Sequence, residues 1–295
     1  MRQRLNHSKI KFHIGDIRDR GSVDDAMTGV DYVFHAAALK QVPSCEFFPM
    51  QATLTNVIGS QNVINSAISH RVSKVVSLST DKAVYPVNAL GITKALMEKI
   101  VQSVSRRISD GQTLLTLVRY GNVLFSRGSV IPLFMKQIRE KKPLTVTEPT
   151  MTRFLLPLPK AIQLVGFALE QGQQGDIFVR KASSCMVGDI AKALKNIFHS
   201  KSEIKIIGMR HGEKMHETLV SKDELVRSED MGDYLRVKMD GRDLNYEKYL
   251  SEGEQKLGQL QDYNSQNATR LTIEEIEELL TTQSEIISAL NSKEL

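Results

Sequence analysis

The stretch Val75-Val-Ser-Leu-Ser-Thr-Asp-Lys82 decides how the chain is organised. Residues 75–79 form a short run rich in apolar, β-branched side chains, which predicts a buried strand. Asp81 and Lys82 follow at the carboxyl end of that strand, where open α/β sheets bind their ligands. Lys94 lies about one turn inside the next expected helix, so a second amine can point at the same crevice.

Two interpretations of this acid and these amines remain open. An aspartate and two lysines around one pocket can transfer protons if burial and like-charge repulsion lower the pKa of an ammonium group. The same residues are equally compatible with an aspartate that caps the next helix and two solvated lysines. Their spacing alone does not decide between the two.

Composition limits the class of protein. The 295 residues are 41% hydrophobic and 25% charged, which is typical of a soluble globular protein with one large domain or two lobes. Cys45 and Cys185 are too far apart in sequence to indicate a disulfide framework or a metal site, so a reducing compartment is expected. The net charge of +5 is spread along the chain, so we expect no nucleic-acid partner. Without an apolar signal region or a membrane-length apolar run, the chain is expected to be cytoplasmic, with no membrane contact.

Strands and helices alternate in the first half of the chain. We expect helices at 22–27, 50–70 and 88–105 between strands at 10–14, 31–37, 75–79 and 113–120. This alternation predicts an α/β fold, a Rossmann-like doubly wound parallel sheet whose carboxyl ends share one edge. The residues at those ends are Asp16, Ala37, Thr80 and Tyr120. His35, near one of them, is expected to be a hydrogen-bonded core residue.

The second half has shorter elements and more loops from Val123 onward. We interpret it as a smaller C-terminal substrate lobe interleaved with the first, and divide the chain into 1–123, 124–245 and 246–295. The expected elements are a helix ending near 142, a strand at 144–147, a turn at 151–154, a helix at 157–171, a strand at 176–180, a helix at 187–198 and a strand at 203–207. Thr272 and Glu275 predict a capping box for a last helix, whose apolar stripe is expected to pack on the chain's own core rather than on another subunit.

Other constellations are weaker. Two histidines and two glutamates between Arg210 and Glu217 invite a zinc interpretation, but their order is not H-E-x-x-H and no metal site is expected. Arg210 suits a phosphate and Glu213 suits sugar hydroxyls, although an exposed turn with an ion pair fits as well. Arg153 has the same ambiguity. No G-x-S-x-G and no Cys–His pair indicates a hydrolytic nucleophile.

Seven motifs, taken in order, resemble one family, the UDP-N-acetylglucosamine 4,6-dehydratases of the extended short-chain dehydrogenase/reductase superfamily. These enzymes serve bacterial capsule, O-antigen and flagellin-sugar synthesis, and the most similar branch is the 5-inverting one of capsule synthesis. Residues 229–234 and 242–246 also resemble that branch. The seven motifs are His35-Ala-Ala-Ala-Leu-Lys-Gln-Val-Pro43, Thr55-Asn56, Leu78-Ser-Thr-Asp-Lys82, Arg119-Tyr-Gly-Asn-Val123, Ser126-Arg-Gly-Ser-Val-Ile-Pro132, Met151-Thr-Arg-Phe154 and Arg210-His-Gly-Glu-Lys214.

The resemblance implies a reaction and a set of site residues. NADP, or NAD, would take hydride from C4 of UDP-N-acetylglucosamine, Lys82 would remove the C5 proton, and Asp81 would protonate the departing C6 hydroxyl. Thr80 and Lys94 complete the implied catalytic set, with Lys94 and the nicotinamide lowering the pKa of Lys82. The implied cofactor-binding residues are Asp16, Ile17, Ala37, Lys40, Thr55, Thr80, Lys94 and Val123. The implied substrate-binding residues are Lys40, Asn122, Val130, Arg210 and Glu213. A homo-oligomer is also expected.

Two departures from the family pattern matter. Leu90 stands where the superfamily's Tyr-x-x-x-Lys has its tyrosine; the 5-inverting branch lacks that phenol too, and Tyr85 is a nearby candidate acceptor for the C4 proton. The sequence also has no glycine-rich turn for the cofactor pyrophosphate, so we expect an N-terminally truncated copy, or a misplaced start codon, that lacks the first strands of the sheet. Such a chain should bind NADP poorly and expose apolar strand faces and edges.

Two other functions remain open at this point. One is an inactive remnant that only binds UDP-sugars or pairs with an intact paralogue. The other is a UDP-sugar 4-epimerase, which would release product without losing water.

Overall fold

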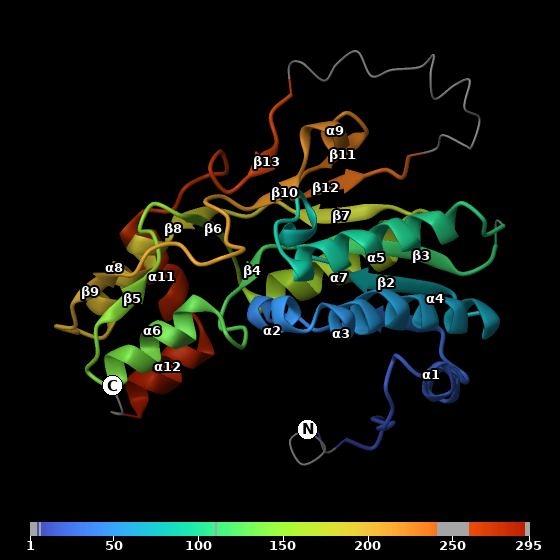
Figure 1. Cartoon of the computed structure of the whole chain (residues 1–295), viewed down its shortest axis with the longest axis horizontal. Coiled ribbons are helices and arrows are strands. Elements are labelled where there is room, and N and C mark those ends of the chain that lie inside the picture. The colour runs from blue at the N-terminus through green and yellow to red at the C-terminus, as the bar shows by residue number, and fades with distance from the viewer. Residues whose placement is uncertain (1–4, 6, 110, 241–259, 293–295) are drawn as a thin grey trace.

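The computed structural model describes residues 5, 7–109, 111–240 and 260–292 (Figure 1). The motif at 242–246 lies outside these residues, as does part of the last expected region. The largest sheet of the described residues has the strand order β1-β2-β3-β7-β12-β11. The first four strands run parallel to one another, and β12 and β11 are added antiparallel. The bounds are β1 Tyr32–His35, β2 Lys74–Leu78, β3 Leu114–Arg119, β7 Ile177–Arg180, β12 Tyr234–Val237 and β11 Ser228–Met231.

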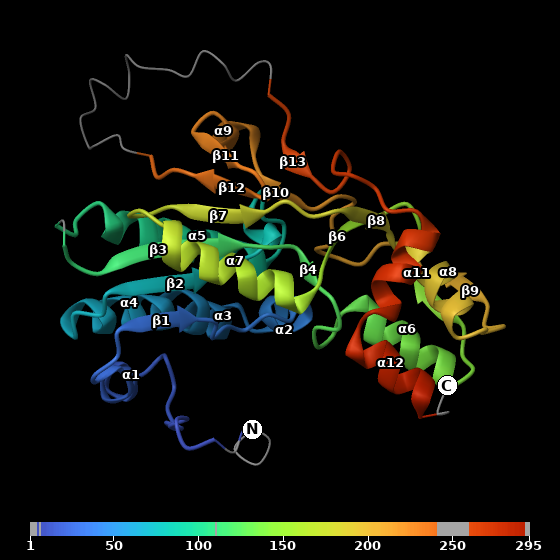
Figure 2. The same cartoon turned by 180° about the vertical axis from the view of Figure 1, so that it is seen from behind.

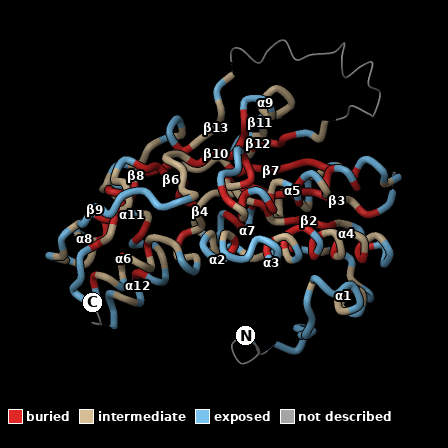
Figure 3. Tube along the Cα trace, viewed as in Figure 1, coloured by how far each residue is buried: buried red, intermediate tan, exposed pale blue. Residues whose placement is uncertain are grey.

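Helices cover both faces of this sheet. Helices α4 (Ser60–Ser69) and α5 (Ala89–Ser105) lie on one face, and α7 (Leu158–Gln171) lies on the other (Figures 1 and 2). Adjacent residues of β3 pack on opposite faces of the sheet. Leu117 packs with α4 and α5, and Val118 packs with α7. Figure 3 shows buried residues following the central strands, as a parallel sheet covered on both sides requires. The predicted Rossmann-like α/β fold is confirmed.

The strand expected at 10–14 is wrong. These residues form an exposed loop that leads to α1 (Arg20–Met27), and β1 pairs only with β2 in the described sheet. A strand exists only where a ladder partner accepts its backbone hydrogen bonds, and no such partner is described for this loop. On β1, Tyr32 is 62% exposed and Phe34 is 51% exposed, so the expected open apolar edge is confirmed.

The helix expected at 50–70 is divided into three pieces. These are α3 (Pro49–Thr53), the π-helix η1 (Leu54–Gly59) and α4. A π-turn inside a helix often marks a functional position, and here it carries Thr55 and the buried Asn56. The amide of Asn56 accepts from Leu39 N at 2.8 Å and donates to Leu39 O at 3.0 Å, which fixes the loop that follows β1.

A second core forms around α8 (Val187–Ile197), α6 (Val130–Arg139) and α11 (Ile273–Thr281). Ile276 and Leu280 of α11 are fully buried there, so the predicted docking of the last region on the chain's own core is confirmed. The capping box of Thr272 is confirmed as well, although the expected single helix ends at Thr281 and α12 (Ser284–Asn291) follows.

The turn expected at 151–154 is wrong, because residues 152–156 form strand β6, which pairs with β4 on one side and β8 on the other. Those partners come from distant parts of the sequence, so the local pattern did not indicate a strand. The remaining elements are α2 (Val42–Phe47), η2 (Asp81–Ala83), β4 (Asn122–Val123), β5 (Leu144–Val146), β6 (Thr152–Leu156), β8 (Ser184–Met186), β9 (Ile204–Ile206), β10 (Thr218–Val220), α9 (Lys222–Leu225) and β13 (Tyr263–Asn264).

Candidate active site

The carboxyl end of β2 carries an acid–amine pair. After β2 the chain makes the short 3-10 turn η2, and the Thr80 hydroxyl caps it by accepting from Lys82 N at 3.3 Å. Asp81 is fully buried. Its Oδ1 accepts from the Thr80 hydroxyl at 2.8 Å and lies 3.1 Å from Lys82 Nζ. The structure therefore brings together three of the four predicted catalytic residues.

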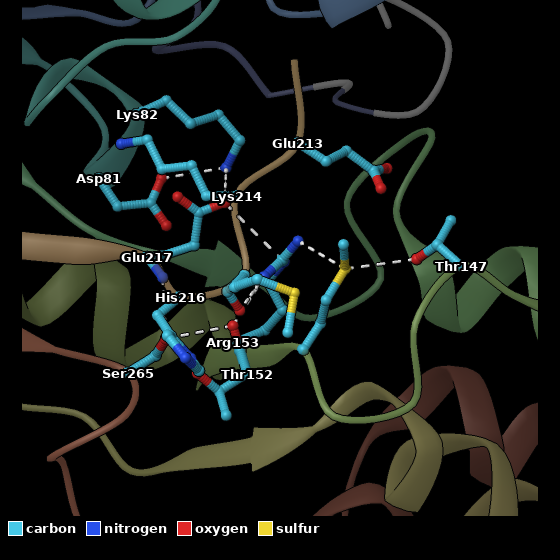
Figure 4. Close-up of polar contacts among 12 residues, drawn as sticks. Asp81, Lys82, Thr147, Thr152, Arg153, Glu213, Lys214, His216, Glu217 and Ser265 are labelled. Carbon is cyan, nitrogen blue, oxygen red and sulfur yellow. Dashed lines mark hydrogen bonds and ion pairs between the residues drawn. The ribbon is translucent and has the colours of Figure 1, made fainter. Parts of the chain in front are cut away.

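A second buried carboxylate faces the same amine. Glu217, immediately before β10, is 3% exposed, and its Oε1 lies 3.4 Å from Lys82 Nζ and 3.8 Å from Arg153 Nε (Figure 4). Lys82 thus bridges two buried carboxylates. The other oxygen of each, Asp81 Oδ2 and Glu217 Oε2, is buried without a hydrogen-bond partner. Buried polar atoms are nearly always hydrogen-bonded, so this pair of unsatisfied oxygens calls for a functional explanation.

The loop that contains Arg210 and Glu213 brings another amine to this cluster. Asn88, the residue that caps α5, donates to Gly212 O at 2.8 Å and so holds the loop against the start of that helix. Lys214 reaches in beside Asp81 and Lys82 (Figure 4), and its Nζ donates to Val84 O at 2.5 Å. Burial lowers the pKa of Lys214, in opposition to the nearby carboxylates.

The two lysines of the predicted catalytic set have opposite electrostatic environments. Burial opposes the charge of Lys82, but Asp81 and Glu217 outweigh it and raise the pKa of Lys82. The expectation that this pKa is lowered is therefore wrong. It is Lys94 whose pKa burial lowers, to about 8, against the attraction of Glu98. The Lys94 ammonium donates to Leu78 O at 2.8 Å, at the last residue of β2.

The buried amine of Lys94 predicts a pH-dependent stability. Between pH 8 and 10.5 the unfolded chain keeps a proton that the folded chain has released, so the free energy of unfolding rises with pH through this window. Relative to Lys94→Met, the wild-type chain should gain up to about 3 kcal/mol across it. Urea unfolding of both proteins at a series of pH values measures this difference. Lys99→Met, at an exposed position of α5, is the control, and parallel curves for Lys94→Met and wild type would contradict the prediction.

An apolar core residue stands at the position of the missing tyrosine. Leu90 is 5% exposed and packs in a small core with Cys45 and Ala52. The phenol of Tyr85 donates to Asp262 Oδ1 at 3.1 Å, away from the Asp81–Lys82–Glu217 cluster. Burial and Asp262 both raise its pKa, so less of Tyr85 is present as the phenolate that could accept the C4 proton. Nothing in the structure supports Tyr85 as the acceptor for the C4 proton.

Residues from two other strand ends lie near Asp81 or Lys82. A Cβ built on Gly121 would come within 3.3 Å of Asp81 Oδ2, so the turn into β4 passes beside that carboxylate. The next residue, Asn122, has a buried Oδ1 without a hydrogen-bond partner. Lys40 lies in the loop after β1. Burial lowers its pKa, and the positive charges of Arg127 and Lys82 lower it further, so the amines of Lys40 and Lys82 are close enough to repel each other.

Other predicted site residues have their described contacts elsewhere. Asp16 forms an exposed ion pair with Arg18. Ile17 packs against the main core, and Val130 packs against the second core. The backbone of exposed Arg210 is 3.4 Å from Glu213 Oε2. None of these contacts is with Asp81, Lys82 or Glu217. Ala37 is exposed just beyond β1, Thr55 is half-buried in η1, and Val123 pairs with Leu156 in β4–β6.

His35 is a core residue, as expected. It is buried, and its Nε2 lies 2.8 Å from the Ser60 hydroxyl. Burial lowers its pKa to about 3, and the nearby charge of Lys94 acts in the same direction.

Within the described ranges, no group of three or more His, Cys, Asp or Glu side chains is arranged to hold a metal ion. No helix among those residues is both long and apolar enough to cross a membrane.

Comparison with known proteins identifies the family. Residues 1–239 match the model of a family described as polysaccharide biosynthesis protein, and residues 240–286 match the model of its C-terminal part. The chain belongs to the polysaccharide biosynthesis protein family. A relative from Rickettsia felis, named UDP-glucose 4-epimerase, is 58% identical over 280 residues, which are 95% of this chain and 82% of the relative. The Rickettsia typhi relative of the same name is 58% identical over 282 residues, 96% of this chain and 83% of its own length.

Solved structures agree with this membership. Pen from Bacillus thuringiensis superposes with a TM-score of 0.84 at 36% identity, over 95% of this chain and 84% of that one. DesIV from Streptomyces venezuelae, a dTDP-glucose 4,6-dehydratase solved with NAD, gives a TM-score of 0.66 at 21% identity over 72% of this chain and 71% of that one. At that identity the second likeness shows the fold alone.

Sequence reasoning did not assign Glu217 or Lys214 to the site. Glu217 directly precedes Thr218-Leu-Val220, a short apolar run that ends up as buried strand β10. Asp81 was found because it follows a strand, whereas Glu217 precedes one, so the rule that pointed to Asp81 does not point to Glu217. Only the folded chain shows that both carboxylates meet one amine.

Proposed function

We propose that this member of the family is a nucleotide-sugar lyase that carries out the 4,6-dehydration of UDP-N-acetylglucosamine, with epimerisation at C5, for bacterial surface polysaccharide synthesis. The single observation that carries the proposal is the amine of Lys82 beside the buried Asp81, at the carboxyl end of β2. An acid and a base side by side suit the removal of a proton and a hydroxyl from neighbouring carbons.

The residues present fit one end of a nicotinamide dinucleotide. The Lys94 ammonium donates to Leu78 O at 2.8 Å and to Met97 Sδ at 3.5 Å, and keeps one more N–H for a ribose hydroxyl. The sequence offers no glycine-rich turn for the pyrophosphate, so the fit concerns the nicotinamide-ribose end. When bound, NADP or NAD would supply the acceptor for the C4 hydride and its return to C6. The residues proposed to hold it are Asp16, Ile17, Ala37, Lys40, Thr55, Thr80, Lys94 and Val123.

Once C4 is a ketone, the protein's own groups move two protons. The C5 hydrogen is then α to a carbonyl, and Lys82 takes it as a proton while its bonding electrons form the C5–C6 double bond. Asp81 hands a proton to the C6 hydroxyl, which leaves as water. Because Lys82 Nζ lies 3.1 Å from Asp81 Oδ1, the proton gained at C5 can replace the one given up at C6. Reprotonation of C5 from the opposite face inverts that carbon. The residues proposed to hold the UDP-sugar are Lys40, Asn122, Val130, Arg210 and Glu213.

A UDP-sugar 4-epimerase is the second candidate, and the name of the Rickettsia relatives favours it. Epimerisation at C4 moves a proton on the C4 hydroxyl and needs no acid or base at C5 and C6. The buried Asp81 and its amine partner would then have no step to serve, which is why we place this function second.

NMR of the sugar product tests the proposal. The protein is incubated with UDP-N-acetylglucosamine and NADP in deuterated water, both as residues 1–295 and with a glycine-rich strand–turn–helix segment placed before Met1. We expect a 4-keto-6-deoxy sugar that carries deuterium at C5, formed only by the protein with the added segment. A C4 epimer that retains the C6 hydroxyl would favour the epimerase instead. UDP-sugar binding in both proteins without turnover or bound NADP would favour the inactive remnant.

We also propose that a second copy of the chain covers an apolar face on η1 and α5. Leu54 and Ile58 of η1, with Ile92 and Leu96 of α5, are 36–55% exposed and recur at one-turn spacing on neighbouring elements. A contiguous exposed apolar surface of this kind usually marks an interface. A homodimer related by two-fold symmetry would bury the same patch on both copies.

The double variant Ile58→Glu/Ile92→Glu should shift the protein from dimer to monomer at micromolar concentration, because four charges would enter the interface. Analytical ultracentrifugation measures the masses. Ile162→Glu is the control, since Ile162 is 63% exposed on α7, across the sheet. A wild-type protein that is already monomeric would contradict the proposed interface.

A further inference from the structure

The C-terminal part of the chain supports the active-site cluster through one serine. Ser265 follows β13, which pairs with β10, and it is fully buried. Its hydroxyl accepts from Glu217 N at 2.9 Å, and its own N donates to Glu217 O at 2.8 Å. The same hydroxyl lies 2.7 Å from the Thr152 hydroxyl (Figure 4). Ser265 therefore binds both the N–H and the carbonyl of Glu217, and its hydroxyl links that residue to Thr152 of strand β6.

A role in folding alone does not account for Glu217. A buried carboxylate costs free energy unless its charge and its hydrogen-bonding capacity are satisfied, and apolar residues of similar size are often as stable. Glu217 has two cations near Oε1, at 3.4 and 3.8 Å, yet Oε2 is buried without a partner. The predicted reaction does not use this carboxylate either, since Lys82 and Asp81 carry both proton transfers.

We propose that Glu217, held in place by Ser265 of the C-terminal segment, is a positioning residue that aims the amino group of Lys82 and controls when it carries a proton. The inference rests on the proposed function only in naming Lys82 as the base, because the contacts of Glu217 stand without it. The segment that bears Ser265 lies in the part matched by the family's C-terminal model. Its task is then to complete the active site from outside the main sheet.

The charges around Lys82 explain why Glu217 has this control. The groups that face the amine come from several elements. They are Asp81 from η2, Arg153 from β6, Lys40 from the loop after β1, and Lys214 and Glu217 from the segment between β9 and β10. Three neighbours are positive and two are negative. Without Glu217, one carboxylate is left against three cations, and the ammonium form of Lys82 loses much of its stabilisation.

The pH dependence of Lys82 acetylation tests the inference without requiring activity. Only the free amine reacts with trace acetic anhydride, so peptide mass spectrometry over a pH series reports how readily Lys82 loses its proton; its side chain is 24% exposed and open to a small reagent. Glu217→Gln should move the half-reaction point down by about one pH unit or more. Ser265→Ala should move it in the same direction by less, because the carboxylate stays but is less well held.

Asp176→Asn is the matched control. Asp176 is another buried carboxylate with a cation partner, Arg236 Nε at 2.7 Å, but it lies just before β7, at the other end of the strands. It should leave the Lys82 curve unchanged. A folded Glu217→Gln protein whose curve superposes on that of wild type would overturn the inference, and an unchanged curve for Ser265→Ala would overturn the part given to Ser265.

Turnover provides a separate readout. With an active protein, the pH at which the rate of dehydration rises should move down in Glu217→Gln by the same amount as the acetylation curve. A shifted acetylation curve in a protein that turns over no UDP-sugar would refute the proposed function and leave the inference standing. Turnover with an unshifted curve would do the reverse.

Discussion

Lys82→Gln is expected to lower the rate of dehydration by about 100- to 10,000-fold, the usual contribution of a positioned general base. The amide keeps most of the side-chain length and can still hydrogen-bond to Asp81 and Glu217, but it cannot accept the C5 proton.

Two measurements separate this role from a loss of folding. Exchange of the C5 hydrogen with deuterated water should stop in Lys82→Gln, whereas thermal unfolding should show a folded protein. Lys74→Gln is the control, because Lys74 lies at the other end of β2 and its Nζ donates to Leu169 O at 2.6 Å. If Lys82→Gln exchanged C5 hydrogen at the wild-type rate, another group would have to be the base.

The pH dependence of the wild-type rate follows from the same contacts. Asp81 and Glu217 raise the pKa of Lys82, so the amine is charged at neutral pH and must lose its proton before it can act. The rate should therefore rise with pH on the alkaline side of neutrality. Sequence reasoning predicted the opposite shift, because it counted the nicotinamide and Lys94 as neighbours of Lys82 and did not count Glu217.

Prediction from sequence succeeded where the signal was local. The run at 75–79 and the consecutive Asp81 and Lys82 placed a strand, its carboxyl end and the acid–amine pair correctly, since neighbours in sequence stay neighbours in space. It failed where a pairing partner that is distant in sequence decides whether a segment forms a strand. Residues 10–14 have strand composition but no described ladder partner, whereas 152–156 become a strand because β4 and β8 flank them.

The hairpin of β11 and β12 was missed although its turn carries a signal. Gly232 has a φ of +75°, a conformation that favours glycine, and it sits between Met231 and Asp233 at the point where the two strands reverse. Charged residues on β11, including Glu229 and Asp230, hid the period of two that identifies a strand. In the folded chain these acidic side chains pair with cations, such as Arg236 on β12 with Glu229 and Lys181, just after β7, with Asp230.

A buried ion cluster also supports the active site. Of its members, only Arg119 was named from the sequence, as part of a family motif. Arg119, at the end of β3, contacts Glu98 of α5 at 2.6 Å and Glu224 of α9 at 2.8 Å. The hydroxyl of Ser79 donates to Glu98 Oε1 at 2.5 Å, two residues before Asp81. The cluster thus fixes the end of β2 to three other elements, and its loss should reach the catalytic pair.

Arg119→Leu is expected to lower the free energy of unfolding by about 3–5 kcal/mol at neutral pH, because it leaves two buried carboxylates without their cation. The side chains of Arg119 and Glu98 are each 4% exposed, and that of Glu224 is 12% exposed, so water can compensate little. Urea unfolding measures the loss. Arg20→Leu removes an exposed pair with Asp24 and should cost only about 0–1 kcal/mol.

Acid should reduce this difference, and the sign follows from Glu224. Burial opposes its charge, but the hydrogen bonds and charge of Arg119 lower its pKa to about 2, from 4.5 when unfolded. The wild-type contribution is therefore complete above pH 4.5 and is lost as the pH falls toward 2. In Arg119→Leu the same carboxyl is buried without a cation, so protonation stabilises that variant instead. The two stability curves should converge on acidification, and curves that stayed parallel would show that the ion pair is not what holds β2, β3 and α9 together.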